Sequence, residues 1–282
     1  MSITATQVKE LRERTGAGMM ECKKALVETG GNMDVAVDYL RKSGQAKADR
    51  KAARVAADGR IVVLAKGKRA AIAEINSETD FVARDEPFVS FAEAVTRCVL
   101  AGNAVDPESL ASMKLEGDQT VEAARTELVA KVGENISVRR FRRLEAVDHL
   151  GSYTHGARIG VLVSLSGGNE ELARDIALHI AASNPAFIDE QAVPADVRAR
   201  ERAIFAEQAA ASGKPADIVA KIVDGKIARY LKEVTLVGQP FVRNEGNDDT
   251  PVGRLLSDAG ARVTDFVRYE LGEGIEKKPE HD

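Results

Sequence analysis

The chain has 282 residues, 44 % of them hydrophobic and 30 % charged, a composition typical of a globular protein with one large domain or two to three smaller ones. No apolar run of about 18 residues is present, so we expect no transmembrane segment, and a net charge of −4 is unfavourable for a dedicated nucleic-acid binder. Two cysteines without a CxxC motif, and a polar start without the apolar core of a signal peptide, indicate the reducing cytosol.

Three short helices are expected at the N-terminal end. Capping residues, glycine stops and one-sided apolar patterns predict them at residues 4–15, 20–28 and 33–42. Ser43 and Gly44 should end the third helix, and a helical linker rich in alanine and basic residues should follow at 45–57. We therefore expect residues 1–54 to form a three-helix domain with its linker.

After this linker the pattern becomes strand-like. Two β-like runs around Lys66-Gly67-Lys68 predict a hairpin, followed by two helices and a third strand. The expected ranges are 59–64 and 69–75 for the hairpin, 88–101 and 120–131 for the helices, and 136–144 for the strand. We interpret residues 55–146 as one core subdomain.

The same order of elements recurs further along the chain. A second hairpin is expected at 150–153 and 158–165, then a helix at 170–182 and a returning strand at 261–271. Two similar units in one chain indicate a structural repeat. We therefore predict an α+β fold with two repeated subdomains, each with a three-stranded antiparallel sheet and helices. The second subdomain would span 147–275, and 276–282 would form a C-terminal tail.

The second unit contains a helical insertion. Residues 194–211 and 215–234 read as two helices joined by Ser212-Gly213-Lys214, which predicts an antiparallel helical hairpin at about 190–234. Its apolar seam is thin, so the hairpin should project from the core and be mobile.

Motifs of catalysis and cofactor binding are missing. There is no GxxxxGK[ST] loop, no GxGxxG after a strand and no GxSxG. Carboxylates are many, but none forms a recognisable acid/base pair. The four histidines, without HExxH spacing or a nearby CxxC, are His149, His155, His179 and His281. We expect no catalytic residue, no metal site and no cofactor, and so no enzyme.

Three positions have apolar or mixed character that suits binding. Met19 and Met20, near Arg12, are consecutive and cannot share one helix face, so at least one should point outward unless both pack inside the small bundle. Phe81 follows a strand end beside an aspartate, and it either contacts a partner or folds back onto a helix. His155 lies at a hairpin tip, where histidines are usually inert.

Two other functions remain open on these residues. The three-helix domain could act alone as an adaptor. A basic run could bind nucleic acid, although it contains only one aromatic residue and its side chains should alternate between the two faces of a strand. The run consists of Arg139, Arg140, Arg142 and Arg143.

Several motifs resemble those of bacterial elongation factor Ts. LRERTGAGMMECKKAL at 11–26 and EINSETDFVAR at 74–84 are similar to the two signatures of that family. Shorter matches follow in the family's order, at 131–135, 155–160, 238–241 and 272–274. The resemblance implies a ubiquitin-associated-like N-terminal domain, a core of two repeated subdomains and a helical hairpin. A further C-terminal helix of some members is expected to be missing here.

The same resemblance implies a function in translation. The family binds elongation factor Tu carrying GDP and promotes GDP release, so that GTP can rebind. It implies a cytoplasmic heterodimer or higher assembly with that GTPase, and no direct contact with nucleic acid or membrane. Site residues implied by the resemblance are Thr79, Asp80, Phe81 and Val82, which would disturb the Mg²⁺ and phosphate site of the GTPase; Arg12, Met19 and Met20, as an N-terminal anchor; and Val132, Gly133 and His155, as core contacts.

Overall fold

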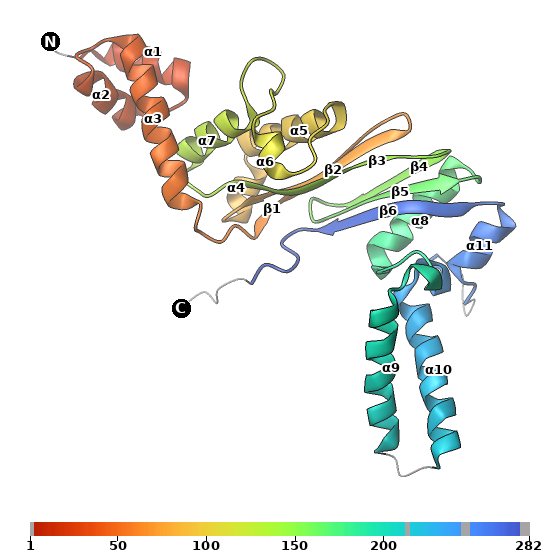
Figure 1. The fold of residues 1–282 in the computed structure, drawn as a ribbon. Coiled ribbons are helices and arrows are strands. Elements are labelled where there is room, and N and C mark those ends of the chain that lie inside the picture. Colours follow the sequence, from red (N-terminus) through yellow and green to blue (C-terminus); the bar gives the residue numbers. More distant parts are fainter. Residues whose placement is uncertain (1–2, 212–214, 244–248, 277–282) are drawn as a thin grey trace.

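The computed structural model describes residues 3–211, 215–243 and 249–276. Three helices are followed by two three-stranded antiparallel sheets with helices, which confirms the predicted fold class. Figure 1 shows the helices α1–α3 at one end, the sheets in the middle and a projecting helical hairpin. The linker at 212–214, tail residues 277–282 and His281 lie outside the described residues.

The N-terminal helices are α1 (Ala5–Thr15), α2 (Met19–Glu28) and α3 (Met33–Lys51). Thr4 and Gln7 form a capping box at the start of α1, and Gly16 ends it with φ of 67°, a conformation that favours glycine. Their small apolar core consists of Val8, Leu11, Cys22, Ala25, Leu26 and Ala36.

The predicted end of the third helix at Ser43-Gly44 is wrong, because α3 continues to Lys51. Gly44 is buried against α7 (Val121–Val132), where an added Cβ would lie 3.5 Å from the Cβ of Ala130. Packing between two helices outweighs the weak helix propensity of one glycine. The N-terminal domain is therefore joined to the core by a continuous helix.

The first sheet is formed by β1 (Asp58–Lys66), β2 (Arg69–Ser77) and β3 (Ser137–Glu145), in the order β1-β2-β3. Apolar side chains of β2 pack against α5 (Glu86–Ala101) and α7 in one core, which includes the fully buried Phe88. Two short helices, α4 (Asp80–Arg84) and α6 (Pro107–Ala111), were not predicted.

The second sheet repeats this arrangement with β4 (His149–His155), β5 (Ile159–Ser166) and β6 (Arg262–Glu270). Its helix α8 (Glu170–Ser183) packs on β4 and β5, and α11 (Val252–Asp258), which was not predicted, precedes β6. Pairing between the second and third strands shifts register at Glu74/Ile75 in one sheet and Ser164/Leu165 in the other. Glu74 and Ser164 are both the sixth residue of their strand, which supports the interpretation as two copies.

The two sheets pack face to face. Ile61 and Ile72 of the first sheet form a shared core with Leu162 and Val267 of the second. Gly160 lies at the closest approach, where a Cβ would come within 2.6 Å of Ile61 Cγ2. The Ile61 N–H also donates to the Ala157 carbonyl at 2.8 Å. The two subdomains therefore form one body with a common interior.

The predicted helical hairpin is present as α9 (Ala195–Ala210) and α10 (Ala216–Val234), which project from the second subdomain (Figure 1). Phe205 and Tyr230 meet edge to face with ring centroids 6.3 Å apart. Two single-turn 3₁₀ helices, Glu190–Ala192 and Leu236–Gly238, flank the hairpin at its base. Along the described ranges, none of the helices combines the length and hydropathy needed to cross a bilayer.

His179 anchors the base of this hairpin. The Val242 N–H donates to its Nδ1 at 3.2 Å, so its Nε2 carries the proton and donates to Gln239 Oε1 at 3.0 Å. Gln239 in turn donates to the Glu233 carbonyl at the end of α10, at 2.7 Å. Burial lowers the pKa of His179, which keeps the ring neutral. The 238–241 motif therefore has a structural role here.

Candidate functional site

Phe81 lies on the outer side of α4, directly after β2, with 81 % of its surface exposed. The alternative in which it folds back onto a helix is therefore wrong. Its neighbours Val82 and Ala83 pack on the core of the first subdomain instead. A single exposed apolar residue is common, so Phe81 marks a binding site only if α4 is held firmly in place.

Glu134 holds the start of α4. Thr79 caps the helix by accepting from the Val82 N–H at 3.4 Å. Its own hydroxyl donates to Glu134 Oε1 at 2.7 Å, and its N–H donates to Glu134 Oε2 at 3.0 Å. One carboxylate thus orients both the cap hydroxyl and the backbone from which Phe81 projects.

A second carboxylate, on the segment after β2, binds the segment that precedes β3. Glu78 Oε1 accepts from the Asn135 N–H at 2.6 Å, and its other oxygen lies 3.4 Å from Arg54 Nη1. The Asn135 amide donates to the Arg54 carbonyl at 2.8 Å. The segment after β2, the segment before β3 and the end of the N-terminal linker are therefore bound to one another.

Val132 and Gly133 lie beside this contact, at the end of α7. Val132 is half-buried and packs on the same core as Val82. Gly133 ends the helix with φ of 81°, and its carbonyl accepts from Lys51 Nζ. The structure thus brings the predicted residues of the two motifs, 79–82 and 132–133, to one end of the first subdomain.

Asp80 is exposed and pairs with Arg84 one turn along α4, at 2.8 Å. Such an exposed pair contributes about 0.3–0.5 kcal/mol. The carboxylate also lies in the first turn of the helix, where a negative charge is favourable. Because the pair is weak, its charges remain available to a partner.

The predicted N-terminal residues lie apart from α4. Met19 and Met20 are 59 % and 75 % exposed at the start of α2, so the alternative that both pack inside is wrong. Arg12 is exposed on α1. Figure 1 shows α1 and α2 separated from α4 by the length of α3. Any partner that touches both must be large.

His155 is exposed at the end of β4, in the turn to β5. In the same turn, the Ala157 carbonyl accepts from the Ile61 N–H, near the start of β1. Since β1 starts opposite the end of β2, this turn lies toward the α4 end of the first sheet. His155 and Phe81 are therefore presented by different subdomains of one rigid body.

Most arginines of the basic run on β3 form ion pairs within the protein. Arg139 and Arg140 both bind Glu74, and Arg142 pairs with Asp265 of β6 at 2.7 Å. The predicted alternation of faces is wrong at Arg139, because the register shift places it beside Arg140. Three of the four guanidinium groups of the run are therefore paired with carboxylates of the protein itself.

Sequence reasoning missed the roles of Glu78, Glu134 and Glu74. Glu78 and Glu134 stand inside the matched motifs, but their contacts join residues 57 and 55 positions apart. Nothing in the spacing of one sequence indicates such pairs. Among the described residues, no group of three or more His, Cys, Asp or Glu side chains is placed to hold a metal ion.

Comparison with known proteins assigns these features to one family. A family model described as elongation factor TS matches residues 78–273. The elongation factor Ts of Thioalkalivibrio sulfidiphilus is 58 % identical over 285 residues, covering 100 % of this chain and 96 % of that protein. Those of Methylococcus capsulatus and Idiomarina loihiensis are 57 % and 52 % identical, each covering 99 % of this chain and 95 % and 94 % of their own lengths.

Proposed function

Because the chain belongs to the elongation factor Ts family of translation factors, we propose that it is the nucleotide-exchange factor of elongation factor Tu. It would bind the GTPase in its GDP form as a heterodimer or higher assembly in the cytoplasm, and promote GDP release so that GTP can rebind. It would need no cofactor and perform no bond chemistry of its own. The observation that carries the proposal is the exposed Phe81 on a firmly held helix.

Phe81 would act as a wedge in this reaction. It would enter a cleft beside the nucleotide site of the GTPase, while Asp80 sets how α4 docks. Mg²⁺ bridges the phosphates to the protein, so shifting the elements that support the ion weakens GDP binding. The carboxylate of Glu134, which fixes the cap of α4, supports this role because a wedge must not yield when it meets its target.

The thermodynamics limit what one side chain can do. An exchange factor must bind the nucleotide-free GTPase better than the GDP form. The factor lowers the affinity of the GTPase for GDP by the same ratio by which GDP lowers its affinity for the factor. A hundredfold loosening of GDP requires about 2.7 kcal/mol of differential binding. Burial of one phenylalanine contributes about 1.5–3 kcal/mol, so larger effects need a second contact, such as His155.

The N-terminal methionines would supply affinity instead. We expect Met19→Ala with Met20→Ala to weaken association with the GTPase, while the rate of GDP release within the saturated complex changes little. Both side chains are exposed, so the fold should be unaffected. Stopped-flow release of fluorescent GDP at increasing factor concentration separates the two quantities. Val35→Ala, at another exposed apolar position of this domain, is the control. A slower plateau rate with unchanged half-saturation would reject the anchor role.

Glu134→Ala is expected to have the opposite effect: it should slow GDP release within the saturated complex and change association with the GTPase little. It removes both acceptors of Thr79, so α4 loses its fixed start, and the plateau rate of GDP release should fall about tenfold, the effect of 1.4 kcal/mol. The control is Glu127→Ala, which removes an exposed glutamate of α7 and so changes the charge by the same amount. Equal plateau rates for the two variants would show that the cap contact does not serve exchange.

The function itself is tested by release of labelled GDP from elongation factor Tu with and without this chain. Acceleration at substoichiometric factor supports the proposal, and an unchanged rate rejects it. The adaptor alternative, in which only the three-helix domain binds, predicts that variants at Phe81 behave like the wild type.

A further inference from the structure

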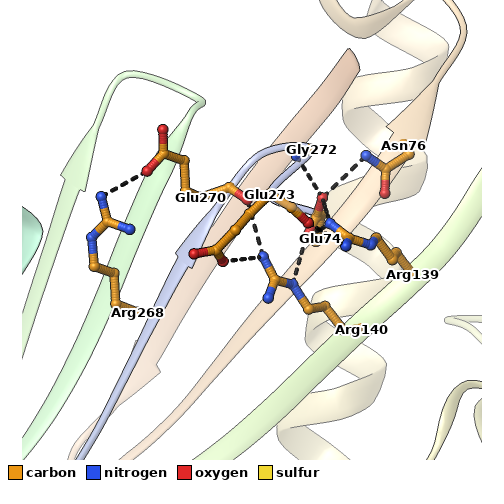
Figure 2. A network of polar contacts seen from close by, with 8 residues as sticks. All are labelled: Glu74, Asn76, Arg139, Arg140, Arg268, Glu270, Gly272 and Glu273. Carbon is orange, nitrogen blue, oxygen red and sulfur yellow. Dashed lines mark hydrogen bonds and ion pairs between the residues drawn. The ribbon is translucent and has the colours of Figure 1, made fainter. Parts of the chain in front are cut away.

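Glu74 is a fully buried carboxylate between the two subdomains. Its Oε1 accepts from the Gly272 N–H at 2.9 Å and from Arg139 Nη1 at 2.9 Å, and its Oε2 accepts from Arg140 Nε at 2.6 Å (Figure 2). Burial alone would raise the pKa of Glu74, but these donors outweigh it and hold the pKa below its usual range. The group is therefore ionised and saturated with donors at neutral pH.

A register shift brings the two arginines together. Glu74 pairs with Arg140 and Ile75 pairs with Val138, so Arg139 is the extra residue of β3. At such a bulge two consecutive residues oppose one residue of the partner strand, which allows both side chains to reach it. The geometry concentrates two guanidinium groups on one carboxylate.

The same arginines extend into the second subdomain. Arg140 Nη2 donates to the Glu270 carbonyl at 3.0 Å and to Glu273 at 3.1 Å, and its guanidinium lies 4.2 Å from the ring centre of Tyr269. Arg139 donates to the Glu273 carbonyl. The turn after β6 is thus bound to the first sheet, through Glu74 of the central strand β2 and the two arginines of the edge strand β3 (Figure 2).

The second copy shows that the bulge does not require charges. Ser164 takes the place of Glu74 there, and Thr264 is the extra residue of β6. Their hydroxyl oxygens lie 2.6 Å apart. Buried ion pairs often stabilise a protein no more than neutral replacements do. Stability of the sheet alone therefore does not explain why the first copy has a charged cluster.

Glu74 is linked to both proposed contacts with the GTPase. Toward His155, the Gly272 N–H that binds Glu74 follows Leu271, whose N–H donates to the Arg158 carbonyl of the β4–β5 turn at 2.8 Å. Toward Phe81, Asn76 donates to Glu74 at 3.2 Å, on the strand that leads directly into α4.

We propose that Glu74 is a positioning residue for nucleotide exchange: it holds α4 with Phe81 and the turn with His155 in a fixed relation, so that contact at one drives the other into the GTPase. The inference rests on the proposed function. It predicts energetic coupling between Glu74 and His155, which are linked indirectly through Gly272, Leu271 and the turn at Arg158.

A double-mutant cycle tests this coupling. Release of fluorescent GDP from elongation factor Tu is measured at saturating factor for the wild type, Glu74→Gln, His155→Ala and the double variant. We expect each single variant to lower the plateau rate about tenfold, and the double variant to be no slower than either single one. Asp265→Asn, which removes the cross-sheet ion pair with Arg142, is the control and should leave the effect of His155→Ala unchanged.

The outcomes are distinct. Plateau rates that multiply in the double variant, or a wild-type rate for Glu74→Gln, would overturn the inference while leaving the proposed function in place. A wild-type chain that does not accelerate release would reject the proposed function. If Glu74→Gln does not fold, Arg139→Gln, which keeps Arg140 and the Gly272 N–H on the carboxylate, replaces it in the same cycle with the same expectation.

Discussion

Replacing Phe81 with alanine is expected to slow GDP release from elongation factor Tu about ten- to hundredfold. The ring is 81 % exposed in the free protein, so its removal takes little from the fold. In the complex it would become buried, and the lost burial of about 1.5–3 kcal/mol appears as a smaller preference for the nucleotide-free GTPase. The effect belongs to the saturated complex rather than to association.

The measurement is the plateau rate of fluorescent GDP release at increasing factor concentration, with circular dichroism to verify folding. Val105→Ala is the matched control, because Val105 is 83 % exposed and lies on the same subdomain outside α4. Phe81→Leu should retain part of the rate, since it keeps an apolar side chain at the same place. An alanine variant with the wild-type rate would mean that the wedge does not exist.

Glu74→Gln is expected to lower the free energy of unfolding by about 3 kcal/mol. A neutral side chain leaves Arg139 and Arg140 without their common carboxylate between two packed sheets. The value is at the lower end for buried pairs because both guanidinium groups remain 27–29 % exposed. Urea unfolding measures it, and Asp265→Asn, a half-exposed cross-sheet pair, should cost less than about 1 kcal/mol.

The same group predicts a dependence on pH. The pKa of Glu74 is lowered by folding below its ordinary value of 4.5, because the donors on its carboxylate outweigh burial. Its stabilisation is therefore fully present above that ordinary value and is lost as pH falls through the lower pKa of the folded state. Stability of the wild type should drop more steeply in acid than that of Glu74→Gln. If the free energy of unfolding depends on pH in the same way for both proteins, the ion pairs of Glu74 contribute no net stability.

Local patterns were sufficient for most elements. Apolar alternation and turn residues place the strands within a few residues, and a capping threonine with glycine stops places the helices α1 and α2. The repeat was visible because each copy has the same order of hairpin, helix and returning strand. These features depend on neighbours in the chain, which a sequence displays directly.

Local patterns failed where a distant segment decided the outcome. Gly44 reads as a helix end, but contact with α7 carries α3 through it. Asp80–Arg84 was not predicted as a helix, but the Thr79 cap and its bonds to Glu134 make it one. Arg139 and Arg140 read as side chains on opposite faces, until the bulge brings both to Glu74.

The sequence by itself determined the order of elements, the duplication and, through its motifs, the family to which the candidate site belongs. Only the tertiary structure decided which carboxylates hold α4, which ones join the subdomains, and that Phe81, Met19 and Met20 remain exposed. The reason is physical. Most helices and strands follow from the nearest few residues, whereas burial, ion pairing and the extent of α3 and α4 depend on groups that only folding brings into contact.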